Sequence, residues 1–406
     1  MADVLRRLFP PPPTLPVVPP GMYHRMTAAP LGSPYRLHLR VDGDGRGLLI
    51  VNASTVLHLN QTATAYAWHL LHGTDDEQAA QWVAQRFRIT RGRARRDGRL
   101  IRDQIEALAE GEDQDPVVVM GMERLEPFAD RPPAPYRLDL ALTFRTADES
   151  RQDPRARRTV GRELETDEWK AVLSQAWTAG IPHVVFTGGE PTIRADLPAL
   201  IRHAENLGQV SGVVTGGERL SDAARMDRLL RAGVDHLLVV VDANNPASLD
   251  GLKRAVEADV FCAAHLTFGP AAAAVETQLR QLKSLGVSRV SVSAPPGPAG
   301  ETALRVAQQE MAELGLSLVW DLPVPYSRHN PLRLELADRA MGRAWLYVEP
   351  DGDVLPTQGE EPVLGSLLRD SILALWQRDS QSTSPTSPER PPTTGHSAGS
   401  ASVPAA

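Results

Sequence analysis

Residues 183–191, HVVFTGGEP, join a short apolar run to two glycines, a glutamate and a proline. An apolar run of this length, bounded by turn residues, is typical of a buried strand over residues 183–186. Glycines directly after a strand let another backbone or a ligand approach closely, because they carry no Cβ. The stretch therefore predicts a buried strand that ends in a tight turn.

The alternation of strand and helix repeats on both sides of this stretch. The expected strands cover residues 138–144, 183–186, 211–215, 236–241, 260–268 and 289–294. The expected helices cover residues 166–180, 196–208, a segment that ends at 233, 246–258, 271–286 and 301–315, with Thr166 as the cap of the first. Parallel strands with right-handed crossovers predict an α/β fold of six βα units, either a partial TIM-type barrel or an open doubly wound sheet.

Charge and hydropathy limit which binding partners and which cellular location are expected. The chain of 406 residues has a net charge of -7, which gives no electrostatic reason to expect nucleic acid or an anionic membrane as a partner. No run approaches the ~18 apolar residues of a transmembrane helix, and the apolar part of residues 1–9 is too short for a signal peptide. We therefore expect a cytoplasmic protein. The arginine-rich segment 91–102 is interpreted as a solvated helix face.

The N-terminal third divides into two parts. Residues 1–34 are rich in proline and lack helical or strand periodicity, so we expect a flexible lead-in. A small α+β domain is expected over residues 35–109. Its expected elements are strands over 35–41 and 48–51 around a glycine-rich turn, a helix over 60–71 capped by Asn60 or Thr62, a helix that opens at Thr74 or Asp75, and a helix over 96–109.

The remaining segments frame the α/β part, which we expect over residues 136–325. Residues 110–135 are expected to be a linker. Within residues 326–378, the Asp351-Gly352 pair predicts the turn of a β-hairpin over 344–356. Residues 379–406 are rich in Ser, Thr, Pro and Gly, and we expect a disordered tail.

Residues 136–191 resemble the opening of a radical-SAM enzyme. Residues 138–145, LDLALTFR, are similar to the first barrel strand of that family, and Gly188-Gly189-Glu190-Pro191 is similar to its GGEP motif. The resemblance favours the six-unit partial barrel. It implies that the 188–191 turn binds the amino group of S-adenosyl-L-methionine, with Thr215 and Asp242 as further cofactor-binding candidates after the third and fourth strands. The alternative is a turn retained for folding alone.

The cysteines of that family are missing. Its first loop carries three cysteines in a CxxxCxxC spacing, where this sequence has Thr146, Ser150 and Asp153. Soft thiolates suit iron–sulfur clusters, and alcohols with one carboxylate do not. The only cysteine of the chain, Cys262, lies in an expected strand, where we interpret it as a small buried hydrophobic residue. We therefore expect no iron–sulfur cluster and no catalytic residue.

An oxygen-ligand cation site is the alternative for the same loop. Asp148, Glu149 and Asp153 lie within six residues, and carboxylates bind divalent cations. We interpret them instead as a charged loop in water, without a metal.

Two further segments resemble parts of peptide-maturation systems. Residues 35–109 resemble the winged-helix-like PqqD-type recognition domain, in which a leader peptide adds as a strand to the sheet edge. Residues 344–356 and 363–376 resemble the SPASM-type C-terminal extension of peptide-modifying radical-SAM enzymes, with Thr357 where a cysteine normally follows the proline.

The resemblances together imply a degenerate radical-SAM-like pseudoenzyme. Its implied partners are a precursor or leader peptide, or an intact maturase. Two alternatives stay open: an S-adenosylmethionine-binding enzyme of the same ancestry that acts without its own cluster, and a purely structural interaction protein.

Overall fold

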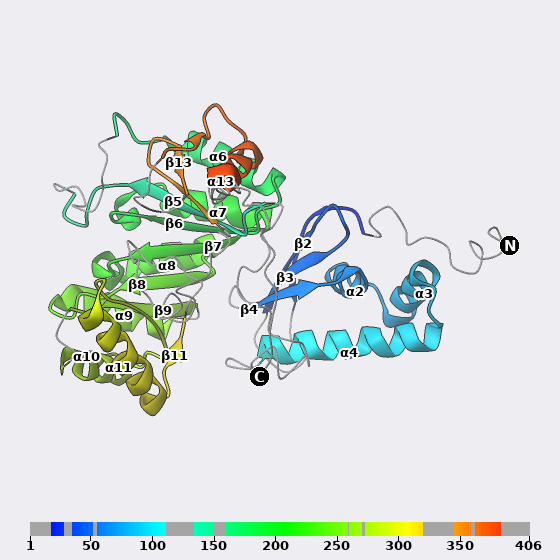
Figure 1. Ribbon diagram of the computed structural model, residues 1–406, viewed down its shortest axis with the longest axis horizontal. Coiled ribbons are helices and arrows are strands. Elements are labelled where there is room, and N and C mark those ends of the chain that lie inside the picture. The colour runs from blue at the N-terminus through cyan, green and yellow to red at the C-terminus, as the bar shows by residue number, and fades with distance from the viewer. Residues whose placement is uncertain are drawn as a thin grey trace, which may run out of the picture.

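The computed structural model describes residues 18–27, 35–51, 55–110, 134–149, 160–258, 260–269, 273–319, 345–356, 358 and 362–382. Within these ranges the chain is organised by two sheets, a four-stranded antiparallel sheet and a ten-stranded, mostly parallel sheet (Figure 1). Each sheet has its own apolar core. In the same part of the chain, no helix combines the length and the hydropathy needed to cross a membrane.

The N-terminal sheet has the strand order β1-β2-β3-β4, and each strand is antiparallel to its neighbours. Its strands are β1 (Gly21–Thr27), β2 (Tyr35–Val41), β3 (Gly47–Val51) and β4 (Thr55–Leu59). Strand β4 lies at one edge, where Leu57 and Leu59 are buried and Val56 is 41% exposed. Alternate burial of this kind is typical of a strand with one face on the core.

Three helices pack on this sheet: α2 (Gln61–Leu71), α3 (Asp76–Phe87) and α4 (Arg91–Glu110). Asn60 caps α2, because its side chain accepts the backbone N–H groups of Thr62 and Ala63 at 3.1 and 2.9 Å. Asp75 caps α3 in the same way. Each of these residues is one of the two cap candidates expected for its helix.

The expectation of a lead-in without regular structure is wrong for residues 21–27. These residues form β1, and all seven pair with β2, from Gly21 opposite Val41 to Thr27 opposite Tyr35. The strand depends on this pairing, since its own sequence shows no alternation of apolar and polar residues. Residues 1–17 and 28–34 lie outside the described residues.

The large sheet has the order β11-β10-β9-β8-β7-β6-β5-β12-β13-β14, and neighbours from β11 to β12 are parallel. Six of its strands are those expected from the sequence, with ends within two residues: β5 (Arg137–Thr143), β6 (His183–Gly188), β7 (Val210–Thr215), β8 (His236–Val240), β9 (Phe261–Thr267) and β10 (Arg289–Ser293). The remaining strands are β11 (Ser317–Leu318), β12 (Trp345–Val348), β13 (Asp353–Leu355) and β14 (Gly365–Ser366). The predicted mixed α/β fold with a parallel sheet is confirmed.

The helices that follow these strands pack on one face of the sheet. They are α6 (Thr166–Thr178), α7 (Leu197–Leu207), α8 (Ala223–Ala232), α9 (Pro246–Glu257), α10 (Ala273–Ser284) and α11 (Pro298–Leu314). Val184 and Phe186 of β6 belong to the core that contains these helices, whereas Val185 between them belongs to a cluster without any described helical residue. A doubly wound sheet carries helices on both faces, and the described helices do not follow that plan.

Two local expectations for this part are corrected. The N-cap of α6 is Glu165 and not Thr166, whose hydroxyl instead donates to Asp196 Oδ2 at 2.7 Å. The expectation of a disordered tail is wrong for residues 379–382, because helix α13 (Ile372–Ser382) includes them and Asp379 is buried. The predicted hairpin is confirmed, with β12 and β13 antiparallel around Gly352 in the left-handed region at φ 88°. Residues 383–406 and Thr357 lie outside the described residues.

Strand β2 joins the two sheets. Arg36 forms ion pairs with Glu205 at 2.8 Å and Asp235 at 2.7 Å. His38 Nδ1 donates to the carbonyl of Gly208 at 2.7 Å. Gly208 lies two residues before β7 and Asp235 one residue before β8, so the N-terminal sheet lies against the N-terminal ends of the parallel strands.

Candidate functional site

The 188–191 turn is pressed against the end of β5. Gly188 has φ 124°, and a Cβ there would lie 2.2 Å from the carbonyl oxygen of Thr143. A Cβ at Gly189 would lie 2.2 Å from the carbonyl oxygen of Arg145. The amides of Gly189 and Glu190 donate to these two carbonyls, each at 2.8 Å. Both glycines are therefore required by the approach of one backbone to another.

Glu190 connects this turn to the end of β7. Its side chain is 2% exposed. Its carboxylate accepts the Thr192 amide at 3.0 Å, the Thr192 hydroxyl, the Thr215 hydroxyl at 2.8 and 2.9 Å, and the Gly216 amide at 2.8 Å. Burial raises the pKa of this carboxyl, and the hydrogen bonds of Thr192, Gly216 and Thr215 act in the opposite direction. Glu190 and Thr215 thus form one buried polar group that joins β6 and β7.

The structure separates Asp242 from that group. Pro191 is buried and begins the short helix η1 (Pro191–Ile193), so it fixes the exit of the turn. Asp242 follows β8 and is exposed, and its carboxylate accepts the amide of Asn244 at 2.9 Å. Within the described ranges, no hydrogen bond connects Asp242 to Glu190. Of the six candidate residues, the structure brings five together.

The loop after β5 contains a contact that the sequence did not predict. Arg219, in the short helix η2 (Glu218–Ser221) after β7, donates to the carbonyl of Ala147 from Nε at 3.3 Å and from Nη2 at 3.1 Å. The same guanidinium pairs with the carboxylate of Glu149. Thr146, at the first expected cysteine position, donates to Asp148 Oδ1 at 3.2 Å. Arg219 lies four residues after a predicted strand, and this position was the one signal in the sequence that it could lie near the site.

The residues of this loop do not fit an iron–sulfur cluster. Thr146 offers an alcohol, and Ser150 and Asp153 lie outside the described residues. Cys262 lies in β9 on the helix-covered face, and burial raises its pKa to about 12. No group of three or more His, Cys, Asp or Glu side chains in the described ranges could hold a metal ion. Clusters are held by several thiolates, and this chain has one buried thiol.

An open hollow of about 600 Å³ lies beside the turn. Arg145 and Glu163 line it from the β5 side, and Arg194 and Asp196 line it from the η1 side. Arg194 binds Asp196 through two hydrogen bonds, at 2.9 and 2.8 Å, and Arg145 pairs with Glu163 at 3.5 Å. Because both charge signs line the hollow, it suits a polar or zwitterionic ligand.

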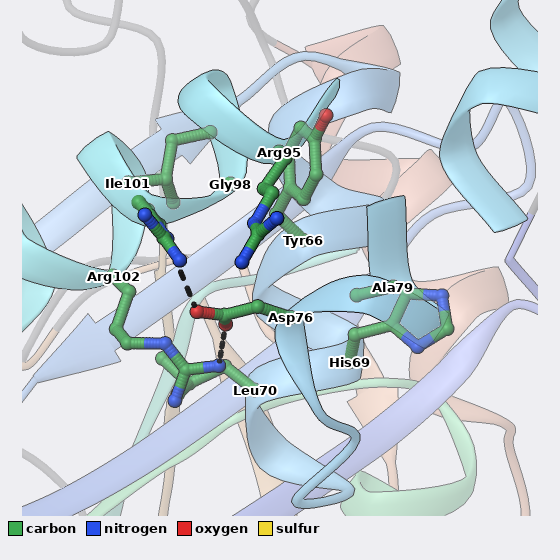
Figure 2. Close-up of a pocket in the computed structure, with 10 residues that line it drawn as sticks. Tyr66, His69, Leu70, Asp76, Ala79, Arg95, Gly98, Ile101 and Arg102 are labelled. Carbon is green, nitrogen blue, oxygen red and sulfur yellow. Dashed lines mark hydrogen bonds and ion pairs between the residues drawn. The ribbon is translucent and has the colours of Figure 1, made fainter. Parts of the chain in front are cut away.

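The N-terminal part has a much smaller pocket between α2, α3 and α4. Its volume of about 20 Å³ is room for about one water molecule. Figure 2 shows Asp76 within this pocket, with Arg102 directed toward its carboxylate at 2.6 Å. Arg99 also pairs with Asp76, at 3.7 Å, and Arg95 pairs with Glu77, at 3.5 Å. The Arg95–Glu77 pair is exposed, as expected of a solvated helix face, whereas Arg102 is half-buried against Asp76.

Buried histidines lie at the opposite end of the parallel strands from the 188–191 turn. His183 Nε2 and His236 Nε2 are 2.7 Å apart. Burial lowers the pKa of His236 to about 3 and that of His38, at the contact between the sheets, to about 4. These side chains are therefore neutral near pH 7.

Part of the chain matches the model of a known protein superfamily. Residues 149–267 match the family model described as the Radical SAM superfamily. This stretch of the chain is therefore similar to a radical-SAM domain.

The relatives found by sequence comparison are named PqqA peptide cyclase. The relative from Granulibacter bethesdensis is 38% identical over 99 residues, which are 24% of this chain and 26% of that protein. The relative from Xanthomonas oryzae pv. oryzae is 27% identical over 281 residues, which are 60% of this chain and 74% of that protein.

Solved structures show the same fold. Streptococcus suis SuiB bound to S-adenosylmethionine matches at a TM-score of 0.55 and 12% identity, over 84% of this chain and 86% of that chain. SuiB bound to the precursor peptide SuiA matches at a TM-score of 0.54 and 12% identity, over 83% of this chain and 86% of that chain. At this identity the likeness concerns the fold alone.

Proposed function

We propose that this chain is a pseudoenzyme of radical-SAM ancestry that binds a precursor peptide or a partner maturase in a peptide-modification pathway. The match to the radical-SAM family model and the relatives named PqqA peptide cyclase support the pathway. The main observation in support of a loss of radical chemistry is the number of cysteines. Cys262 is the one cysteine of the chain, it is buried in β9, and Thr146 stands where the first cluster cysteine is expected.

The domains are assigned in the same proposal. Residues 35–109 are a PqqD-like, winged-helix-like recognition domain, residues 136–325 a six-unit partial barrel, and residues 326–378 a SPASM-like remnant. The packing of the described helices on one face supports the barrel, because a barrel has helices only outside its strands. The hairpin of β12 and β13, which continues the sheet from β5, supports the remnant.

The peptide-binding edge is β4. Strands β1 and β4 are the two edges of the sheet, since each has one paired neighbour among the described strands, and we assign the peptide to β4. An added strand gains main-chain hydrogen bonds at such an edge. Val56 is 41% exposed there, and the ring of His58 meets the ring of Tyr136 edge-on at 5.7 Å, so the added peptide would lie beside the start of β5.

A binding measurement tests this edge. Fluorescently labelled PqqA precursor peptide is titrated with the full chain, with Val56→Lys and with the matched control Leu368→Lys, whose leucine is 48% exposed on the C-terminal extension. A lysine on an edge strand opposes strand addition. We expect Val56→Lys to weaken binding at least roughly tenfold, about 1.4 kcal/mol, and Leu368→Lys to leave it unchanged. Equal affinities for all three proteins would refute the β4 assignment.

Anaerobic reconstitution tests the loss of radical chemistry. The purified chain is incubated with iron and sulfide, desalted, and analysed by absorbance and iron counting. We expect no bound cluster. A cluster at close to one per chain, with an electron paramagnetic resonance signal that a chelator removes, would overturn the pseudoenzyme proposal.

The second candidate is an enzyme that binds S-adenosylmethionine without a cluster. The observation in its favour is the complete 188–191 turn together with the Arg219 guanidinium in contact with the loop after β5. The turn would hold the ammonium group and Arg219 the carboxylate, and the bound cofactor would supply an electrophilic sulfonium. Calorimetry with S-adenosylmethionine tests this candidate, since the absence of heat at millimolar ligand would remove it.

A further inference from the structure

We propose that Arg219 is the carboxylate-binding residue of the barrel mouth, occupied here by Glu149 and, in a complex, by the methionyl carboxylate of S-adenosylmethionine. The inference rests on the second candidate function, because it concerns the cofactor named there. In this inference the Arg219 guanidinium binds the cofactor carboxylate, in a chain that lacks the thiolates for an iron–sulfur cluster.

The position of Arg219 follows from the bonds around β6. Strand β6 lies between β5 and β7. Glu190 spans this gap, because its amide donates to Arg145 and its carboxylate accepts from Gly216. Arg219 spans the same gap from three residues beyond Gly216 to Ala147, two residues beyond Arg145. The guanidinium therefore contacts the loop that begins at the first expected cysteine position, the loop that follows the strand bonded to the GGEP turn.

The present partner of Arg219 is suited to exchange. Glu149 is 50% exposed, whereas Arg219 is 21% exposed, so the cation is the more fixed member of the pair. Glu149 also has φ 60°, a left-handed conformation that costs a residue with a Cβ free energy. A ligand carboxylate can replace Glu149 as the charged acceptor of the guanidinium, while Nε and Nη2 keep their hydrogen bonds to the carbonyl of Ala147. Displacement of Glu149 releases the loop from that conformation.

The other arginines near the turn are already engaged with protein groups. Arg194 makes two hydrogen bonds to Asp196 and further bonds to the carbonyls of Leu142 and Leu164. Arg145 pairs with Glu163, which lines the hollow beside α6. Arg225 donates to the carbonyl of Thr192 at 3.2 Å. Among these four arginines, Arg219 is the one paired with a half-exposed carboxylate of the loop after β5.

Two adenosine compounds separate the carboxylate contact from the rest of the site. S-adenosylhomocysteine carries the amino-acid carboxylate, and 5′-methylthioadenosine lacks the amino-acid part. Calorimetry measures both with the full chain, Arg219→Met, Arg219→Lys, Glu149→Gln and the control Arg231→Met, whose arginine is 77% exposed on α8. We expect Arg219→Met to weaken S-adenosylhomocysteine roughly 10–100-fold, as for a lost charged hydrogen bond, and to leave 5′-methylthioadenosine unchanged. Arg219→Lys should restore part of the loss, and Glu149→Gln should tighten S-adenosylhomocysteine.

The outcomes distinguish this inference from the function on which it rests. If Arg219→Met binds S-adenosylhomocysteine as tightly as the unmodified chain does, the assignment of Arg219 is wrong and cofactor binding stands. If neither compound binds the unmodified chain or Glu149→Gln at millimolar concentration, the second candidate function and this inference are both wrong. The unchanged affinity for 5′-methylthioadenosine shows that a variant is folded. Peptide binding at β4 is measured separately and is unaffected by either result.

Discussion

Replacement of His38 by asparagine should remove a defined part of the acid sensitivity of this protein. His38 is 3% exposed, and its Nδ1 donates to the carbonyl of Gly208 at the contact between the two sheets. Its Nε2 is buried without a hydrogen-bond partner among the described residues. Asparagine can place an amide N–H close to the position of Nδ1, and it cannot ionise. The substitution therefore keeps the donor and removes the titration.

The magnitude follows from the pKa. Burial lowers the pKa of His38 from 6.5 to about 4. Between these values the unfolded state binds more protons than the folded state, so the free energy of unfolding falls as the pH falls. The contribution of His38 is fully present above pH 6.5, and by pH 5 about 2 kcal/mol of it is lost. The asparagine variant should lose about 2 kcal/mol less than the unmodified chain between pH 8 and pH 5.

Urea unfolding at pH 8, 6 and 5, followed by circular dichroism, measures this difference. The pKa of buried His236 is lowered by its own burial and by Arg137, so its contribution is the same in both proteins and cancels in the comparison. His72→Asn is the matched control, because the exposed His72 makes the same kind of bond, from Nδ1 to the carbonyl of Trp68 at 2.7 Å. The reasoning is refuted if His38→Asn and the unmodified chain lose equal stability between pH 8 and pH 5.

Three substitutions test the 188–191 turn, and a labelling experiment tests the lone thiol. Glu190→Ala should cost about 3–5 kcal/mol of unfolding free energy, because it leaves the donors of Thr192, Thr215 and Gly216 buried without an acceptor; a loss below about 1 kcal/mol in urea unfolding would contradict this. Glu190→Gln keeps the shape and should cost less. Gly189→Ala should cost more than about 3 kcal/mol, since its Cβ would lie 2.2 Å from a backbone oxygen, and a melting temperature equal to that of the unmodified chain would argue against the close approach. Cys262, with a pKa of about 12, should not react with a disulfide reagent at pH 8 until urea unfolds the chain, and rapid labelling of the folded protein would count against its burial.

The fold was predictable where local sequence carries the signal. Strands β5 to β10 are covered by helices on one side and bounded by turn residues, so the sequence of each is a short apolar run. Glycine marks the end of several helices. Strand β1 was not predictable, since all of its pairing is with residues of β2 and its sequence shows no alternation. Strand β4, too, follows the predicted hairpin without a pattern of its own that separates it from a loop.

The candidate site was predictable in part for a related reason. The turn and Thr215 follow the ends of neighbouring parallel strands, and such ends meet at one edge of a sheet, so Glu190 and Thr215 come into contact. Asp242 also follows a strand, but its carboxylate accepts the Asn244 amide two residues on, a local contact that competes with longer-range ones. Arg219 acts through a long side chain that crosses a whole strand, and no spacing along the chain encodes that reach.

The opposite placement of the N-terminal sheet and the 188–191 turn has a consequence for any peptide held at β4. The sheet meets the strands just before β7 and β8, whereas the turn follows β6, and the six residues of β6 span ~20 Å at 3.3 Å per residue. A tethered chain needs at least about six extended residues to travel that far. The scaffold would then act as a molecular ruler: it would present to the mouth only those side chains that lie far enough along the peptide from its anchored segment.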